Sequence, residues 1–184
     1  ANRGNKVVLS PNTHCYFDFY QSKDTQHEPF AIGGYTPVEK VYSFEPIPSV
    51  LTEEQAKLVI GAQCNLWTEY IKTFSQAQYM ELPRLAALCE VQWTEPQLKD
   101  YESFKDRIPA MFAIYDKYGY NYAKHLCDVN ATYTPVPEKK ALEVVFTTLK
   151  NREIRYTTDG SEPDANSILY QGPFTVDSDV VIKA

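Results

Sequence analysis

Hydrophobic and polar positions in the first two thirds of the chain alternate between strand-like and helix-like patterns. Residues 6–10 (KVVLS) form a short apolar run that suits a strand buried on both faces, and residues 61–67 predict a second strand. Between them, the aromatic-rich segment 11–48 is a loop of the length that is usually functional in a compact domain. A capping box, with Gln55 three residues after Thr52, predicts a helix just before the second strand.

Two longer helices are predicted next, because apolar residues recur at intervals of three and four. The first spans 78–93, where Pro83 is tolerated if it lies in the first turn. The second spans 101–117, and Pro109 is expected to kink or divide it. We interpret both apolar stripes as core faces. They comprise Leu82, Leu85, Ala86, Cys89 and Trp93 in the first helix and Tyr101, Phe104, Ile108, Phe112 and Tyr115 in the second.

The order of these elements is strand, loop, helix, strand, helix, helix. This order favours an α/β fold in which helices cover a parallel sheet, as in a (β/α)8 TIM barrel. A whole barrel needs about 200 residues or more, so only about two of its units fit here. We therefore expect residues 1–127 to form the C-terminal part of such a barrel.

The remainder of the chain shows short strands separated by turn residues. Residues 139–184 are expected to form a small antiparallel β-sandwich of the immunoglobulin or fibronectin type, with a turn at Asp159-Gly160. The last predicted strand reaches the end of the sequence, so an incomplete β-sandwich module is one of the alternatives. Residues 128–138 are polar, contain two prolines and are interpreted as a linker. The predicted strands are 142–147, 153–158, 167–170 and 180–183.

Charge and composition argue against several classes of function. The net charge is −6, and no run of Lys and Arg is present to follow a phosphate backbone, so we expect no nucleic-acid partner. No apolar stretch approaches the ~18 residues of a membrane span, so we expect no membrane partner. The four cysteines form no C-x-x-C pair, and we expect no metal site.

Candidate chemistry lies where the two predicted strands end. Alternation along HCYFDFY (14–20) predicts one apolar and one polar face. The polar face comprises His14, Tyr16, Asp18 and Tyr20. This segment follows the first strand, and in β/α barrels the active site lies at the C-terminal ends of the strands.

The second candidate group comprises Asn65, Trp67 and Glu69 on one face at the end of the second strand. An indole can cover the apolar face of a sugar ring, while a carboxylate close by accepts hydrogen bonds from the hydroxyls. By pattern alone, the simpler interpretation of both groups is favoured, namely an aromatic-rich strand end with one hydrogen-bonded carboxylate.

Longer stretches of the sequence resemble one known family. The strings VVLSP, YFDFYQ, IGGYTPVEKVYSFEPIP, IGAQCNLWTEYI and YMELPRLAALCEVQWT occur in the order found in the C-terminal half of the family 20 β-N-acetylhexosaminidase catalytic domain. This resemblance covers residues 6–125. Residues 135–184, with IRYTTDGSEP and SILYQGPFTV, resemble the β-sandwich module that follows the barrel in many bacterial members.

The resemblance implies a retaining exo-glycosidase that removes terminal β-linked N-acetylglucosamine or N-acetylgalactosamine. The substrate's acetamido oxygen acts as the nucleophile, and no cofactor is expected. By motif, Tyr16 matches the tyrosine that bonds this oxygen, and Asp18 matches an aspartate that holds sugar hydroxyls. Trp67 matches the tryptophan that floors the sugar pocket, and Glu69 matches the glutamate that binds the 4-hydroxyl.

The family's acid pair, an adjacent Asp-Glu, has no counterpart, because the sequence contains no Asp-Glu dipeptide. We therefore expect the isolated chain to be inactive on its expected partners, N-acetylhexosamine-terminated glycans. Its open sheet edges are expected to meet the missing N-terminal part of the barrel or a second copy of the chain. The resemblance also implies a periplasmic, cell-surface or secreted bacterial protein. The alternative is a non-catalytic carbohydrate-binding or scaffold protein.

Overall fold

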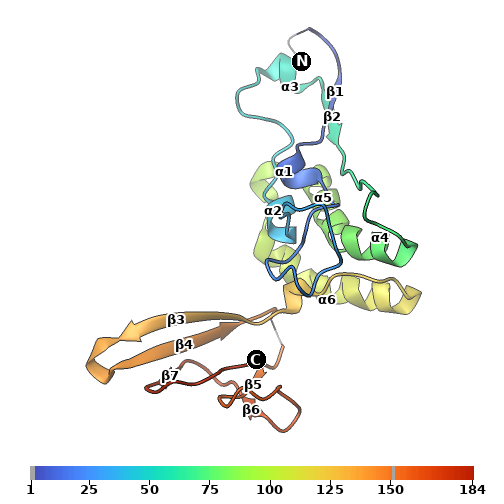
Figure 1. Ribbon diagram of the computed structural model, residues 1–184. Helices are drawn as coiled ribbons and strands as arrows, with labels where there is room; N and C mark the ends of the chain where they lie inside the picture. The colour runs from blue at the N-terminus through green and yellow to red at the C-terminus, as the bar shows by residue number, and fades with distance from the viewer. Residues whose placement is uncertain (1–2, 151) are drawn as a thin grey trace. The chain divides into compact units, whose positions relative to one another are not determined.

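The computed structural model describes residues 3–150 and 152–184 (Figure 1). The chain divides into two compact units, Ala1–His125 and Leu126–Ala184, and each is described by itself. The first contains two parallel strands and several helices, and the second contains small antiparallel sheets. The predicted α/β architecture followed by an antiparallel β module is therefore confirmed.

The first unit begins with the two predicted strands. β1 (Val7–Leu9) and β2 (Val59–Ala62) pair in parallel, and the register shifts by one residue after Val7. The prediction that the first strand is buried on both faces is wrong, since Val8 is 48% exposed. The face of β1 that carries Val8 is therefore not fully covered within the described residues. The strand predicted over 61–67 starts and ends earlier, and its remaining residues continue as extended chain.

Short helices occupy the connection between these strands. They are α1 (Asn12–Cys15), α2 (Val38–Tyr42) and α3 (Glu53–Ala56). The capping box predicted for α3 is confirmed: the Thr52 hydroxyl accepts from the Gln55 N–H at 3.3 Å, and the Gln55 side chain accepts from the Thr52 N–H at 3.0 Å. Two N–H groups at the start of the helix are thereby satisfied.

The single helix predicted over 78–93 is two helices, α4 (Phe74–Glu81) and α5 (Arg84–Trp93). Leu82, which precedes Pro83, is extended with φ −98° and ψ 136°, because a proline ring disfavours helical geometry in the residue before it. A short 3₁₀ turn, η1 (Pro96–Leu98), leads into α6 (Tyr101–Tyr118). Of the two effects predicted for Pro109, a kink or a division, the division does not occur, since α6 continues through it.

The core face of α5 also differs from the prediction. The buried residues of this helix are Arg84, Ala87, Leu88 and Val91. The stripe predicted to be core lies largely open, and its last residue, Trp93, is 90% exposed. The helix has two apolar stripes, and the buried one begins with an arginine, which the hydrophobic pattern did not count. In α6 the predicted stripe is confirmed for Phe104, Ile108, Phe112 and Tyr115. Within the described residues, no helix has the length and apolar character needed to cross a membrane.

The second unit consists of two small antiparallel sheets around one apolar cluster. β3 (Asn130–Val136), β4 (Ala141–Thr147) and β7 (Phe174–Val176) form one sheet in the order β3-β4-β7. β5 (Arg155–Tyr156) pairs with β6 (Ile168–Leu169), and short 3₁₀ turns, η2 (His125–Cys127) and η3 (Pro137–Lys139), flank β3. The buried centre is Val144, Phe146 and Ile154, against which Tyr156, Tyr170 and Phe174 pack.

The expected linker over 128–138 is largely strand. β3 pairs with β4 along its whole length, from Asn130 opposite Thr147 to Val136 opposite Ala141. Pro135 is compatible with this strand because β3 lies at the edge of its sheet, where a proline without an N–H group is tolerated. The strand expected at 180–183 is represented only by isolated bridges, and β7 was not predicted.

Two glycines with the same positive φ allow a test of how tightly the loop after β1 is packed. Gly34 and Gly119 both have φ +68°, which favours glycine. A Cβ atom on Gly119 would meet nothing within 4 Å, whereas one on Gly34 would lie 2.3 Å from Cδ2 of Phe19. We expect Gly119→Ala to lower the free energy of unfolding by about 1 kcal/mol and Gly34→Ala to lower it by about 2 to 3 kcal/mol. Urea denaturation measures both, and equal losses would contradict the packing described for Phe19.

Candidate functional site

The segments that follow β1 and β2 lie side by side. Tyr16 and Asn65 form an isolated parallel bridge, in which the Phe17 N–H donates to the Asn65 carbonyl and the Asn65 N–H donates to the Cys15 carbonyl, both at 2.8 Å. The Asn65 side chain also donates to the Ser10 hydroxyl at 2.8 Å. These bonds place Tyr16 next to the stretch that leads to Trp67, beyond the carboxyl ends of both strands.

Two aromatic rings form a corner at this place. The ring centroids of Tyr16 and Trp67 are 6.1 Å apart, and the ring planes meet at 65°. Trp67 is 48% exposed, and Tyr16 is half-buried. Phe19 supports Tyr16 from the protein side, with 5.7 Å between the ring centroids. An edge-to-face pair with one open indole face can receive a flat apolar surface.

Asp18 lies beside this corner as a buried carboxylate. It is 5% exposed, and within the described residues its Oδ1 atom has no hydrogen-bond partner. Burial raises the pKa of Asp18, and the exposed Glu69 carboxylate raises it further, while the backbone N–H of Trp67 and the Arg84 guanidinium oppose the shift. A buried acceptor without a donor is costly, and because this oxygen is itself buried, a ligand hydroxyl reaches it only if the surrounding side chains move.

The predicted two-faced strand at 14–20 is not observed as such. His14 and Cys15 lie in α1, and Asp18, predicted on the open face, is buried. The other two members of the polar face have contacts within the protein. His14 stacks on Phe44 with 5.4 Å between ring centroids, and the Tyr20 hydroxyl accepts from the Ala31 N–H at 3.3 Å.

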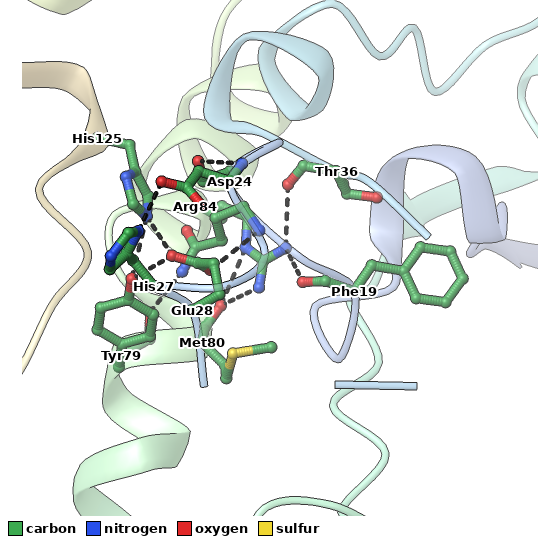
Figure 2. Close-up of polar contacts among 11 residues, drawn as sticks. Phe19, Asp24, His27, Glu28, Thr36, Tyr79, Met80, Arg84 and His125 are labelled. Carbon is green, nitrogen blue, oxygen red and sulfur yellow. Dashed lines mark hydrogen bonds and ion pairs between the residues drawn. The ribbon is translucent and has the colours of Figure 1, made fainter. Parts of the chain in front are cut away.

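Arg84 was not identified from the sequence, yet it lies directly behind the site. Its side chain is fully buried, and its guanidinium donates to main-chain carbonyls (Figure 2). The acceptors are Phe17 at 2.5 Å, Phe19 at 3.0 Å, Thr36 at 3.0 Å and Met80. Burial lowers the pKa of Arg84, while Glu28 and Asp18 raise it. The guanidinium remains protonated at neutral pH.

A second polar cluster holds the middle of the same loop. The Glu28 side chain is 1% exposed, and its Oε1 atom lies 2.6 Å from both the Tyr79 hydroxyl and Nε2 of His125 (Figure 2). Burial alone would raise the pKa of Glu28, but the hydrogen bonds from His125 and Tyr79 outweigh it and lower the pKa. No local sequence pattern indicates this cluster, because its members come from three distant segments.

Comparison with known proteins identifies the family to which this chain belongs. Residues 1–96 match the sequence model described as the glycosyl hydrolase family 20 catalytic domain. Residues 137–184 match the chitobiase/β-hexosaminidase C-terminal domain. A β-hexosaminidase of Porphyromonas gingivalis is 34% identical over 185 residues, which covers 94% of this chain and 22% of that protein. The chain belongs to glycosyl hydrolase family 20.

Solved structures of the family agree with this assignment. The Streptomyces plicatus N-acetyl-β-hexosaminidase in complex with Thio-NAglucal is 29% identical, with a TM-score of 0.59 over 67% of this chain and 24% of that one. The Vibrio harveyi family 20 exo-β-N-acetylglucosaminidase in complex with N-acetylglucosamine is 34% identical, with a TM-score of 0.58 over 67% of this chain and 19% of that one. The chain therefore spans about a quarter or less of the length of these family 20 relatives.

The Glu28 cluster predicts a pH-dependent contribution to stability. A folded-state pKa below the ordinary value of 4.5 means that the ionised carboxylate stabilises the fold above about pH 5. This contribution is lost as the pH falls through the lowered pKa of Glu28. We expect Glu28→Gln to reduce the free energy of unfolding at pH 7 by about 1 to 3 kcal/mol, with a smaller difference from wild type at pH 3.

The matched control is Glu54→Gln, because Glu54 is exposed and its ion pair with Lys57 lies at the surface. This change is expected to have little effect at either pH. Urea denaturation at pH 7 and pH 3 measures both variants. A Glu28→Gln effect that is the same at both pH values would contradict the role of the ionised carboxylate.

Proposed function

We propose that this chain supplies one side of the terminal-sugar site of an exo-β-N-acetylhexosaminidase. The observation that supports the proposal is the corner formed by Tyr16 and the half-exposed Trp67, with the Asp18 carboxylate next to the Trp67 main chain. Glu69 is exposed and influences the pKa of Asp18, so the two carboxylates belong to the same region as Trp67. The ring geometry supports Tyr16 and Trp67, and the motif match to family 20 adds Asp18 and Glu69.

Each residue has a role that its chemistry can perform. The Trp67 indole covers the C–H face of the hexosamine ring, and Asp18 and Glu69 accept hydrogen bonds from its hydroxyls. The Tyr16 hydroxyl donates to the acetamido oxygen of the substrate. This contact orients the oxygen toward the anomeric carbon that it attacks, which is a contribution of positioning rather than of proton transfer.

None of these four residues is proposed as the general acid. The family's acid pair is an adjacent Asp-Glu, and the 184 residues contain no such dipeptide. General acid catalysis is worth about 100- to 10,000-fold in rate. We therefore propose that the isolated chain holds the sugar without hydrolysing it and that the remaining part of the barrel completes the site. A second copy of the chain could cover the open sheet edges but would not supply the acid pair. Trp93 and Phe74 are exposed apolar side chains that such a partner could cover.

A non-catalytic carbohydrate-binding or scaffold protein is the second candidate function. It is supported by the same sugar-facing corner and by the missing acid pair. The two candidates differ in whether hydrolysis appears when the rest of a family 20 barrel is present. Export to the periplasm, the cell surface or the medium accords with either one and is proposed on the resemblance alone.

The two tryptophans of the chain provide a matched test of sugar binding. Trp67→Ala removes the proposed sugar platform, whereas Trp93→Ala removes an even more exposed indole on α5. We expect Trp67→Ala to weaken binding of N-acetylglucosamine by about fivefold or more, since an aromatic contact is worth about 1 kcal/mol. Trp93→Ala is expected to leave the affinity unchanged. Saturation-transfer NMR at millimolar sugar measures the affinities, and equal effects of the two changes would count against the platform.

The second test concerns catalysis. The purified 184-residue chain is expected to release no chromophore from a chromogenic N-acetyl-β-glucosaminide above the rate in buffer, because no general acid protonates the leaving group. A family 20 enzyme assayed in parallel serves as the positive control. Turnover that follows the chain through a second purification step and disappears with Tyr16→Phe would overturn the proposed inactivity.

A further inference from the structure

We infer that Arg84 is a positioning residue for the sugar site, which it serves by holding the main chain on both sides of Asp18 and by closing the loop that follows. The inference rests on the proposed function, because it assigns to Arg84 the orientation of the carboxylate and of the tyrosine that meet the sugar. Arg84 touches no substrate in this proposal and acts only through its neighbours.

The first part of the argument is the geometry around Asp18. The Arg84 guanidinium donates to the carbonyl of Phe17 at 2.5 Å and to the carbonyl of Phe19 at 3.0 Å, the residues on either side of Asp18. The Phe17 ring also lies against the guanidinium, with 4.8 Å from Cζ to the ring centroid. The peptide group before Asp18 and the one after Phe19 are thus both held by Arg84, which restricts the stretch of main chain that carries the Asp18 side chain. Tyr16 directly precedes Phe17, so it lies next to the same held stretch of main chain.

The second part is the closure of the loop after the site. Arg84 donates to the Thr36 carbonyl at 3.0 Å, and the Thr36 N–H donates to the Tyr20 carbonyl at 2.9 Å (Figure 2). Tyr20 and Tyr35 form a parallel bridge at the same place. The two ends of the loop over residues 20–35 are therefore joined to each other and to one side chain. The remaining guanidinium contacts go to Met80, at the end of α4.

The third part is the chemistry that only an arginine provides here. A guanidinium is planar and presents five N–H donors in fixed directions, whereas a lysine has a single nitrogen that cannot reach carbonyls on opposite sides at once. The positive charge of Arg84 also lowers the pKa of Asp18, against the effects of burial and of Glu69. Asp18 is thereby favoured as the ionised acceptor that sugar hydroxyls require.

The experiment separates positioning from a general role in stability. Arg84→Gln removes the charge, Arg84→Lys keeps the charge but loses the planar fork, and Ile108→Ala is a control that creates a cavity in α6 away from the site. Two quantities are measured on the folded 184-residue chain. They are the pKa of Asp18, from the carboxyl ¹³C shift, and the dissociation constant for N-acetylglucosamine, from NMR titration.

We expect Arg84→Gln to raise the pKa of Asp18 and to weaken sugar binding by about tenfold. Arg84→Lys is expected to keep the pKa near wild type but to weaken binding by about threefold, because one nitrogen cannot hold both flanking carbonyls. Ile108→Ala is expected to lower the melting temperature and leave both quantities unchanged. Wild-type values of both quantities in folded Arg84 variants would overturn the inference.

A further variant decides the case if Arg84→Gln does not fold. Phe17→Leu removes the ring against the guanidinium and leaves Arg84 in place. It is expected to weaken sugar binding and to raise the pKa of Asp18, both to a smaller extent, and the absence of both effects would overturn the inference. If the wild-type chain does not bind N-acetylglucosamine, the proposed function fails, while the pKa of Asp18 still decides whether Arg84 acts on this carboxylate.

Discussion

The buried guanidinium of Arg84 is the interaction on which the first unit depends most. A cation removed from water must find partners for all its donors, and here they are main-chain carbonyls from three separate segments: Phe17 and Phe19, Thr36, and Met80. These segments are the start of the loop, its end, and the end of α4. Removing this side chain would leave those carbonyls buried without donors, so the loop and the helix are energetically linked.

The loop over residues 20–35 is also held at its middle. Glu28 receives hydrogen bonds from Tyr79 on α4 and from His125 at the end of the first unit. The two ends of the loop close near Arg84. Glu28 and Asp18 both favour the positive charge on Arg84 electrostatically. A long segment with little regular structure is thus ordered by buried polar contacts rather than by strand or helix bonds, and such contacts define one geometry because each partner has a direction.

The sequence predicted the parts of this structure that depend on local chemistry. The capping box at Thr52, the buried stripe of α6 and the placement of Tyr16 close to Trp67 followed from caps, periodicity and β/α order. The sequence-based prediction failed where contacts between distant residues determine which side chains are buried. The buried face of α5 begins with Arg84, a residue type that hydrophobic periodicity assigns to the surface. Glu28 is buried where Tyr79 and His125, both distant in the sequence, donate hydrogen bonds to it. The roles proposed for Tyr16, Asp18, Trp67 and Glu69 remain predictions.

In the second unit, β3 is held by main-chain pairing rather than by buried polar side chains. This seven-residue strand pairs with β4 throughout, yet all of its residues except the last, Val136, are exposed. The ladder to β4 therefore supplies almost all of its attachment, and little apolar area is withdrawn from water when it docks. Such a strand detaches at a lower free energy than the cluster around Phe146 unfolds. Its amide protons would accordingly exchange with solvent through local fraying, before the rest of the unit opens.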